Sequence, residues 1–125
     1  MKTIIALLLL FCSTYVFSAA PHCVTTSSGV HLIQWEGTVD QLYINSGNTI
    51  LIYFDTALPL AEAQECNFSP ANRSAATYKL SDNPEFGKLL YSTALAAQMS
   101  NKPIVLQMYS VSSGYMKLDR IWLKN

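Results

Sequence analysis

The stretch SDNPEFGKLLYSTALAAQMSNKPIVLQMY, residues 81–109, predicts one helix followed directly by one strand. Asp82 is placed to cap the start of the helix, and Glu85 completes a capping box. Pro84 fits the first helical turn, where its missing N–H has no intrahelical partner to lose. The spacing of a helix with one buried face is present at Phe86, Leu89, Leu90, Thr93, Ala94 and Ala97.

The helix is expected to end between Ser100 and Pro103, and residues 103–109 then alternate as a strand does. One face of this strand carries the apolar side chains of residues 104, 106 and 108. The sequence before and after this stretch is richer in strand patterns than in helix patterns. We therefore predict a mainly β protein with one long helix.

Residues 30–44 form a long strand-like run with Gly37 near the middle, and the apolar positions change phase across that glycine. A glycine inside a strand is typical of a bulge or a sharp bend. Turn residues at 45–48 join this run to a second strand at 49–55. A long first strand bent at a glycine suits the two halves of a small barrel.

The remaining segments are an irregular stretch at 56–76 with a short helical turn, a short strand at 75–80 and a last strand at 115–124. The order is thus strand, strand, short strand, helix, strand, strand. This order predicts an OB-fold-like five-stranded barrel, β-β-β-α-β-β. The alternative is an α+β roll with the same elements and an open sheet.

The chain begins as a secretory signal peptide does, with a basic residue, a short apolar run and a polar segment ending in small residues. Val16 and Ser18 suit the −3 and −1 positions of a cleavage site. We place the signal peptide at residues 1–18 and a single OB-like domain at residues 19–125. The apolar run is too short to cross a bilayer, so we expect a secreted or periplasmic protein that inserts into no membrane.

Three cysteines are present, and Cys23 and Cys66 remain after the leader is removed. In an oxidising compartment two cysteines in a small domain most simply form one disulfide. The alternative, a reactive or metal-binding thiol, is disfavoured because neither has a CxxC partner or a nearby pair of histidines. A lipoprotein anchored at Cys12 is disfavoured because Phe11 is too large for such a site.

Charge and motifs exclude several functions. The formal net charge is zero at pH 7, and loss of the leader makes the chain slightly acidic, which argues against a nucleic-acid partner. No GxSxG, HExxH, phosphate-binding glycine loop or CxxC is present. Glu36 and Asp40, four apart on a strand, would lie about 13 Å apart, too far for a retaining glycosidase. We predict no enzymatic activity, no metal and no cofactor.

Aromatic residues are the more informative group for binding. Trp35, Tyr43 and Tyr53 lie on the predicted first and second strands. Aromatic faces stack on sugar rings, and the polar edges of tyrosine and tryptophan form hydrogen bonds with hydroxyl groups. We predict these three as ligand-binding residues and carbohydrate as the ligand, against the alternative that they only pack in the core.

A second group of apolar residues lies off the buried face of the predicted helix. Tyr91, Leu95 and Met99 follow the spacing of a second helical stripe. We predict that they form an oligomer interface with the helix of another subunit. The alternative is that the irregular segment at 56–76 covers them.

The leader, the early strand GTVDQLYI at 37–44, the mid-chain cysteine and the segment FGKLLYSTALAAQMSNKPIVLQMY at 86–109 resemble the B subunits of secreted bacterial AB-type toxins. The resemblance is to the subtilase cytotoxin and typhoid toxin kind and to small exported OB-fold proteins related to them. Asn101-Lys102 stands where that family tends to have Gly-Gln. The resemblance implies an OB-fold protomer that assembles as a ring and binds glycans on host cells.

These observations lead to two hypotheses. The first is an exported, non-enzymatic, oligomeric binding protein whose ligand is a carbohydrate. The alternative is a monomeric periplasmic or secreted module that inhibits or escorts another protein.

Overall fold

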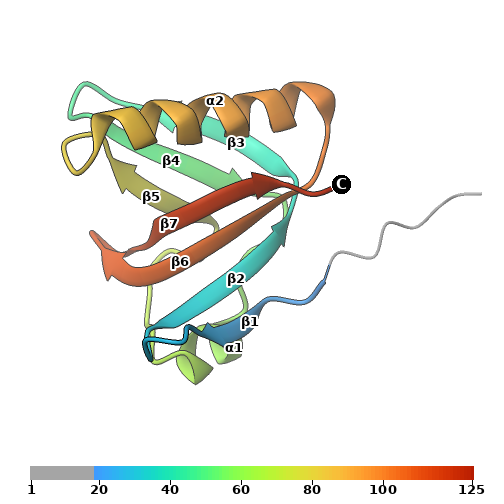
Figure 1. Cartoon of the computed structure of the whole chain (residues 1–125), viewed down its shortest axis with the longest axis vertical. Helices are drawn as coiled ribbons and strands as arrows, with labels where there is room; N and C mark the ends of the chain where they lie inside the picture. The colour runs from blue at the N-terminus through green and yellow to red at the C-terminus, as the bar shows by residue number, and fades with distance from the viewer. Residues whose placement is uncertain (1–18) are drawn as a thin grey trace, which may run out of the picture.

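The computed structural model describes residues 19–125, which form one seven-stranded sheet and two helices (Figure 1). In chain order the elements are β1 (His22–Thr25), β2 (His31–Gly37), β3 (Val39–Ile44), β4 (Thr49–Phe54), α1 (Leu60–Glu65), β5 (Ala75–Lys79), α2 (Pro84–Ser100), β6 (Ile104–Ser112) and β7 (Tyr115–Leu123). The fold is mainly β, as the sequence predicts. The predicted signal peptide at residues 1–18 lies outside the described residues.

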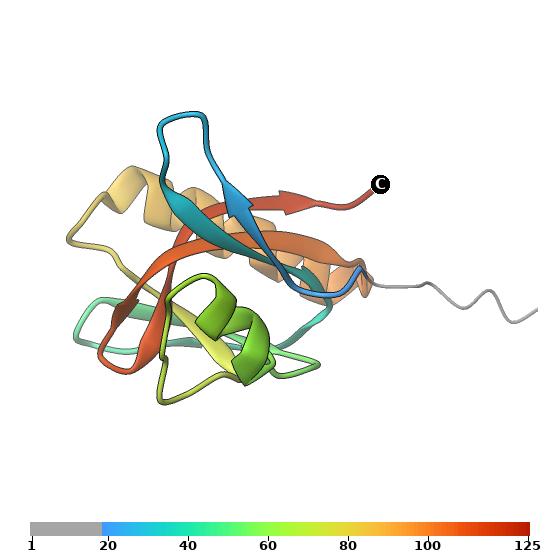
Figure 2. The same ribbon diagram turned by 90° about the horizontal axis from the view of Figure 1, so that it is seen from below.

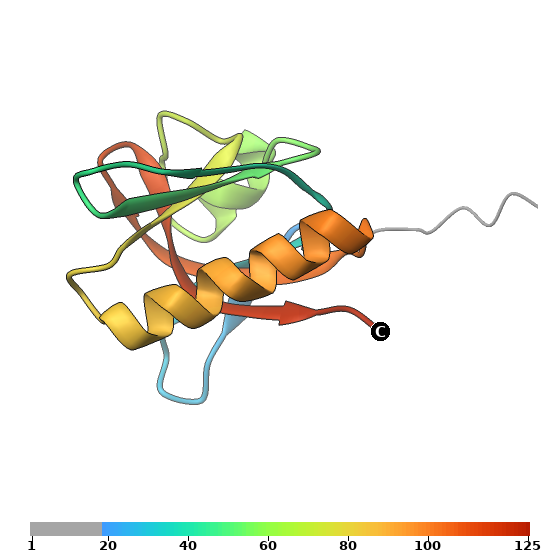
Figure 3. The same cartoon turned by 90° about the horizontal axis from the view of Figure 1, so that it is seen from above.

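The strands are ordered β1-β2-β6-β7-β5-β4-β3 across the sheet. All neighbouring strands are antiparallel except β5 and β7, which are parallel. The helices lie at opposite ends of the molecule in Figure 1, with α2 at one end and α1 beside β1 at the other. Figure 2 shows α1 in front of the sheet, and Figure 3 shows the whole length of α2.

β2 and β3 are one run of chain that bends at Thr38, and its two halves pair with different strands. β2 pairs with β6, whereas β3 pairs with β4. Asp55 Oδ2 accepts hydrogen bonds from the Thr38 backbone N–H at 2.8 Å and from its hydroxyl at 2.7 Å. A Cβ at Gly37 would collide with the Trp35 ring. The predicted bend near this glycine is therefore confirmed.

The predicted five-stranded barrel is not confirmed, because the seven strands form a sheet with β1 and β3 at its ends. The sequence predicts no strand before residue 30, yet β1 lies at His22–Thr25. Its four residues are too few to show an alternating pattern, and pairing with β2 over four positions makes them a strand. α1 forms where the sequence predicts a short helical turn.

The buried face of α2 only partly follows the prediction. Leu90, Ala94 and Ala97 are fully buried as expected, but the prediction for Leu89 is wrong, because this side chain is 67% exposed. Gly87 lies on the buried face instead. A Cβ at this glycine would collide with the end of the Leu80 side chain, which shows that the helix and the chain after β5 lie close together here.

The start of α2 also differs from the prediction. The prediction that Asp82 caps the helix is wrong, because Asn83 accepts the hydrogen bond from the Phe86 backbone N–H at 3.1 Å. Asp82 instead forms an ion pair with Lys117 at 2.7 Å. The helix ends as expected, with Asn101 in the left-handed conformation at φ 51°.

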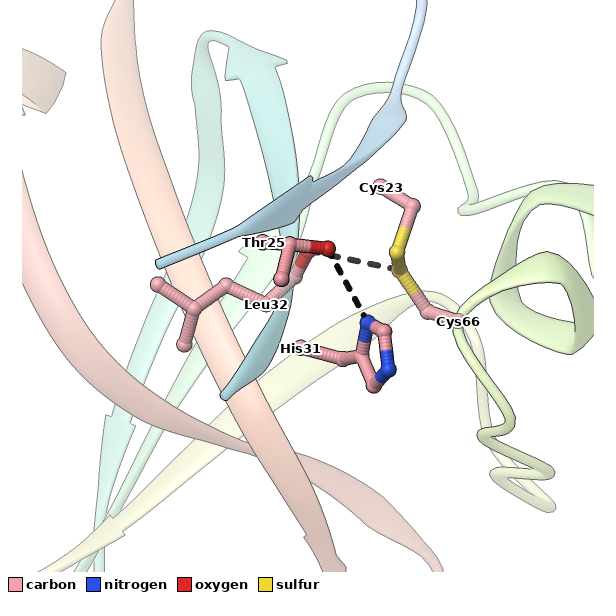
Figure 4. The surroundings of a disulfide bond; sticks show 5 residues. All are labelled: Cys23, Thr25, His31, Leu32 and Cys66. Atoms are coloured by element: carbon pink, nitrogen blue, oxygen red, sulfur yellow. Dashed lines mark hydrogen bonds between the residues drawn. A yellow bond between two sulfur atoms is a disulfide. The ribbon is translucent and has the colours of Figure 1, made fainter. Parts of the chain in front are cut away.

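Cys23 and Cys66 form the predicted disulfide, which joins β1 to the residue after α1 (Figure 4). Cys66 Sγ also lies 3.3 Å from the Leu32 carbonyl oxygen. This is a van der Waals contact, since a bridged sulfur has no hydrogen to donate. Beside it, the Thr25 hydroxyl and the His31 ring are 3.2 Å apart across the β1–β2 pair. The bridge thus fixes α1 against the end of the sheet.

Removing the disulfide should lower the free energy of unfolding by about 4 kcal/mol, because it closes a loop between cysteines 43 residues apart. The measurement is denaturant unfolding of the oxidised protein and of the double variant Cys23→Ser/Cys66→Ala. Thr25→Ala is the control for lost local contacts in β1 and should cost about 1 kcal/mol. A double variant as stable as this control would contradict the prediction.

Candidate functional site

Two depressions lie on the outer face of the sheet, and both are lined by side chains that point away from the core. The first, which we name the hairpin hollow, has a volume of about 190 Å³. It is lined by Thr26, Ser28, Val30, Leu32, Tyr109, Asp119 and Arg120. The second, which we name the tyrosine groove, has a volume of about 600 Å³. Its lining includes Tyr43, Asn45, Tyr53, Thr77, Lys79 and Tyr115.

The turn between β1 and β2 forms one wall of the hairpin hollow. The Thr26 hydroxyl accepts a hydrogen bond from the Val30 backbone N–H at 3.1 Å, and it lies 2.9 Å from the Ser28 hydroxyl. Gly29 takes the left-handed conformation that the turn needs, at φ 82°. These contacts hold two hydroxyl groups at the wall of the hollow.

An irregularity between β6 and β7 forms the opposite wall. The pairing shifts on either side of Met108, so that Tyr109 on β6 and Asp119 on β7 have no directly opposite partner. Such bulges bend a strand and redirect its side chains. Arg120 and Asp119 consequently both line the hollow, and their side chains form an ion pair at 3.1 Å.

Arg120 is further held by a row of amide side chains across three strands. Its guanidinium donates a hydrogen bond to Gln107 Oε1 at 3.4 Å, and Gln107 Nε2 donates to Gln34 Oε1 at 2.9 Å. Gln107 is buried although it is polar, and these two bonds satisfy it. This row of hydrogen bonds orients Arg120, the one cationic side chain that lines the hollow.

The tyrosine groove crosses four strands. Tyr43 on β3 lies opposite Leu51 on β4, and Leu51 lies opposite Thr77 on β5. Tyr53 on β4 and Tyr115 on β7 line the groove beside them. The pKa of Tyr53 is raised, first by partial burial and then by the neighbouring Tyr115 and Tyr43 phenols. The three tyrosines therefore form one cluster.

Lys117 lies between the two depressions. It is on the same face of β7 as Tyr115 and Asp119, because Met116 and Leu118 point into the core. Its pKa is raised by a hydrogen bond to the Asp82 carboxylate and by a second to Tyr109, whose ring centroid lies 5.7 Å from the ammonium. Tyr109 is thus oriented by contacts outside the hollow.

The structure brings together two of the three predicted ligand-binding residues, Tyr43 and Tyr53. Trp35 is only 1% exposed, and its ring stacks on Phe54 with the centroids 4.4 Å apart. Its indole N–H donates to the Thr56 carbonyl at 3.1 Å. Trp35 therefore packs in the core, at the edge of a separate depression of about 240 Å³, and not in the tyrosine groove.

No sequence pattern marks the residues of the hairpin hollow or Tyr115. Thr26 and Ser28 lie before the first predicted strand, in a segment without a motif. Tyr109 and Tyr115 have no local signal that separates them from other aromatic residues. Their positions depend on the β6–β7 pairing, and no local pattern in the sequence marks the bulge.

The predicted interface residues follow one side of α2 but differ in exposure. Tyr91 is half-buried and lines an apolar cleft with Ile44 and Leu80, whereas Met99 is 81% exposed. Leu95 is about one-third exposed. Figure 1 places α1 at the far end of the molecule, so this part of the irregular segment does not cover α2.

Within residues 19–125, no group of three or more His, Cys, Asp and Glu side chains is placed to hold a metal ion. In the same part of the chain, no helix is both long enough and apolar enough to cross a membrane.

No protein-family model matches this chain, and no curated protein or solved structure matches it either. The functional assignment therefore depends on the two depressions themselves.

The stability of the protein should fall as the pH rises above about 10. The pKa of Tyr53 is raised in the folded state, so its contribution is complete below the unfolded value and is lost as the pH rises through the folded value. Tyr115→Phe should bring the Tyr53 pKa closer to 10, measured by phenolate absorbance. The matched control is Tyr91→Phe on α2, and an equal change in both variants would contradict the assigned cause.

Proposed function

We propose that this protein is an exported, non-enzymatic saccharide-binding protein whose binding site is the hairpin hollow. The single observation that carries the proposal is the bulge, which places Tyr109, Asp119 and Arg120 opposite the hydroxyl wall of the β1–β2 turn. An aromatic ring, hydrogen-bond donors and hydrogen-bond acceptors meet there in one small concave site. This combination suits a sugar ring, which has apolar faces and a rim of hydroxyl groups.

The charges of the hollow favour a saccharide over a polyanion. Arg120 is paired with Asp119, so the hollow presents a donor and an acceptor side by side and little net charge. A nucleic-acid site would need several unpaired cations along a surface. The near-zero net charge of the chain agrees with this choice.

The strand order supports an OB-fold-like barrel as the finer description of the fold. The bent β2–β3 run takes the place of a long first strand that pairs at both ends, with β6 and with β4. β4, β5, α2, β6 and β7 then follow in the expected order, with β5 and β7 parallel. On this proposal β1 and α1 are additions joined by the disulfide.

We also propose that a second copy of the chain covers the outer face of α2. Leu89 and Met99 are the most exposed large apolar side chains of the helix, and Leu95 is partly exposed between them. No charged residue follows Lys88 within the helix. Exposed apolar side chains on a helix segment without charges are typical of a contact with another protein chain.

Ser28→Ala should weaken saccharide binding about tenfold, because it removes a hydroxyl from the wall of the hollow. A glycan array identifies the ligand, and titration calorimetry measures the dissociation constant. Arg120→Gln tests the opposite wall and should have an equal or larger effect. Ser92→Ala, which removes a hydroxyl on α2, is the matched control. Binding that is unchanged in both hollow variants would contradict the site.

Light scattering should show an assembly larger than one chain, and Met99→Lys should shift it towards the single chain by placing a charge in the α2 contact. Val111→Lys places the same charge at an apolar residue of β6 that is 40% exposed, and it is the control. A wild-type protein that is monomeric at all concentrations would instead favour the monomeric interaction module.

A further inference from the structure

We infer that the tyrosine groove is a second saccharide-binding site, distinct from the hairpin hollow and suited to a chain of several linked sugar rings. The inference rests on the proposed saccharide-binding function for the class of ligand. The groove itself is formed by a separate set of residues, because the two depressions have no lining residue in common.

The floor of the groove is formed by buried side chains, and three tyrosines line it. Leu51 and Thr77 are buried beneath it on adjacent strands. Tyr53 on β4 and Tyr115 on β7 both line the groove, and Tyr115 lies close enough to contribute to the raised pKa of Tyr53. Tyr43 on β3 is 42% exposed and completes the cluster. Three tyrosines thus offer faces for stacking and hydroxyls for hydrogen bonds.

The two turns that border the groove are held in place before any ligand binds. The Asn45 side chain accepts hydrogen bonds from the backbone N–H groups of Gly47 at 2.9 Å and Thr49 at 3.2 Å. At the other border, the Asn72 backbone N–H donates to the Gly114 carbonyl at 2.9 Å. Because these turns are already ordered, binding costs little conformational entropy there.

The size and chemistry of the groove distinguish it from the hollow. Its volume of about 600 Å³ is roughly three times the 190 Å³ of the hollow, and it falls in the usual range for ligand sites. Lys79 is the one charged side chain that lines it. The groove therefore selects for aromatic stacking along a chain of sugars more than for charge.

The groove and the hollow lie on one face of β7. Tyr115 borders the groove and Asp119 borders the hollow, four positions further along the strand, which corresponds to about 13 Å. Lys117 stands between them, held by Asp82 and Tyr109. A long oligosaccharide that occupies the groove can therefore reach the hollow along this strand. Contacts at both places would raise its affinity above that of a short sugar.

The test uses the intact protein labelled uniformly with 3-fluorotyrosine, observed by fluorine NMR. The resonances are assigned by single Tyr→Phe variants. The probes are galactose-, glucose- and N-acetylglucosamine-based oligosaccharides of increasing chain length. Tyr109 reports on the hollow, whereas Tyr43, Tyr53 and Tyr115 report on the groove. Tyr78, which is buried in the core, is the internal reference.

The expected result is that short sugars shift the Tyr109 resonance and that longer chains also shift the three groove resonances. Tyr115→Ala should then weaken binding of the longest chain about tenfold and leave the shortest sugar unaffected. Movement of Tyr109 alone with every probe would overturn the second site and leave the proposed function intact. Movement of the groove resonances alone would support the second site and remove the hollow from the proposed function. No movement at the groove with any probe overturns the inference.

Discussion

The fold depends on the bend at Gly37 and Thr38, where one run of chain leaves β6 and joins β4. Glycine is required because the Trp35 ring occupies the space that a Cβ would need. Asp55 then fixes the bend through two hydrogen bonds to Thr38. Without this bend the β2–β6–β7 and β3–β4–β5 parts of the sheet would not share a core. The buried residues of both parts do form one cluster, which α2 covers.

The same sheet is uneven on its outer face, and this unevenness creates the candidate sites. A regular β6–β7 pair would alternate one residue in and one residue out along its length. The bulge instead adds Tyr109 and Asp119 to the outer side and aims Arg120 beside them. A row of amides and the Lys117 contacts hold these side chains from outside the hollow. The proposed binding site therefore depends on the irregular pairing of β6 and β7 around Met108.

Sequence reasoning succeeded where the determining contacts are local and failed where they are not. The boundaries of α2 follow from Pro84 and Asn101, whose conformational preferences act within one turn. The sequence predicts Asp82 as the helix cap, one residue before the observed cap Asn83, because both residue types cap helices well. In the structure Asp82 pairs with Lys117, and Asn83 accepts the capping hydrogen bond. The sequence pattern around Trp35 fits a core residue and a ligand contact equally well. Its stacking on Phe54, which assigns it to the core, depends on the tertiary structure.

The sequence by itself determined the mainly β class, the position of the long helix, the bend in the first strand and the pairing of Cys23 with Cys66. Each depends on periodicity, on one special residue or on a simple count, which remain readable in a linear chain. Only the tertiary structure decided that β1 is a strand, that Leu89 faces outwards, and that Tyr43, Tyr53 and Tyr115 form one groove. These features require register between segments far apart in the chain. Register is set by the summed packing of the whole sheet, which no short stretch of sequence contains.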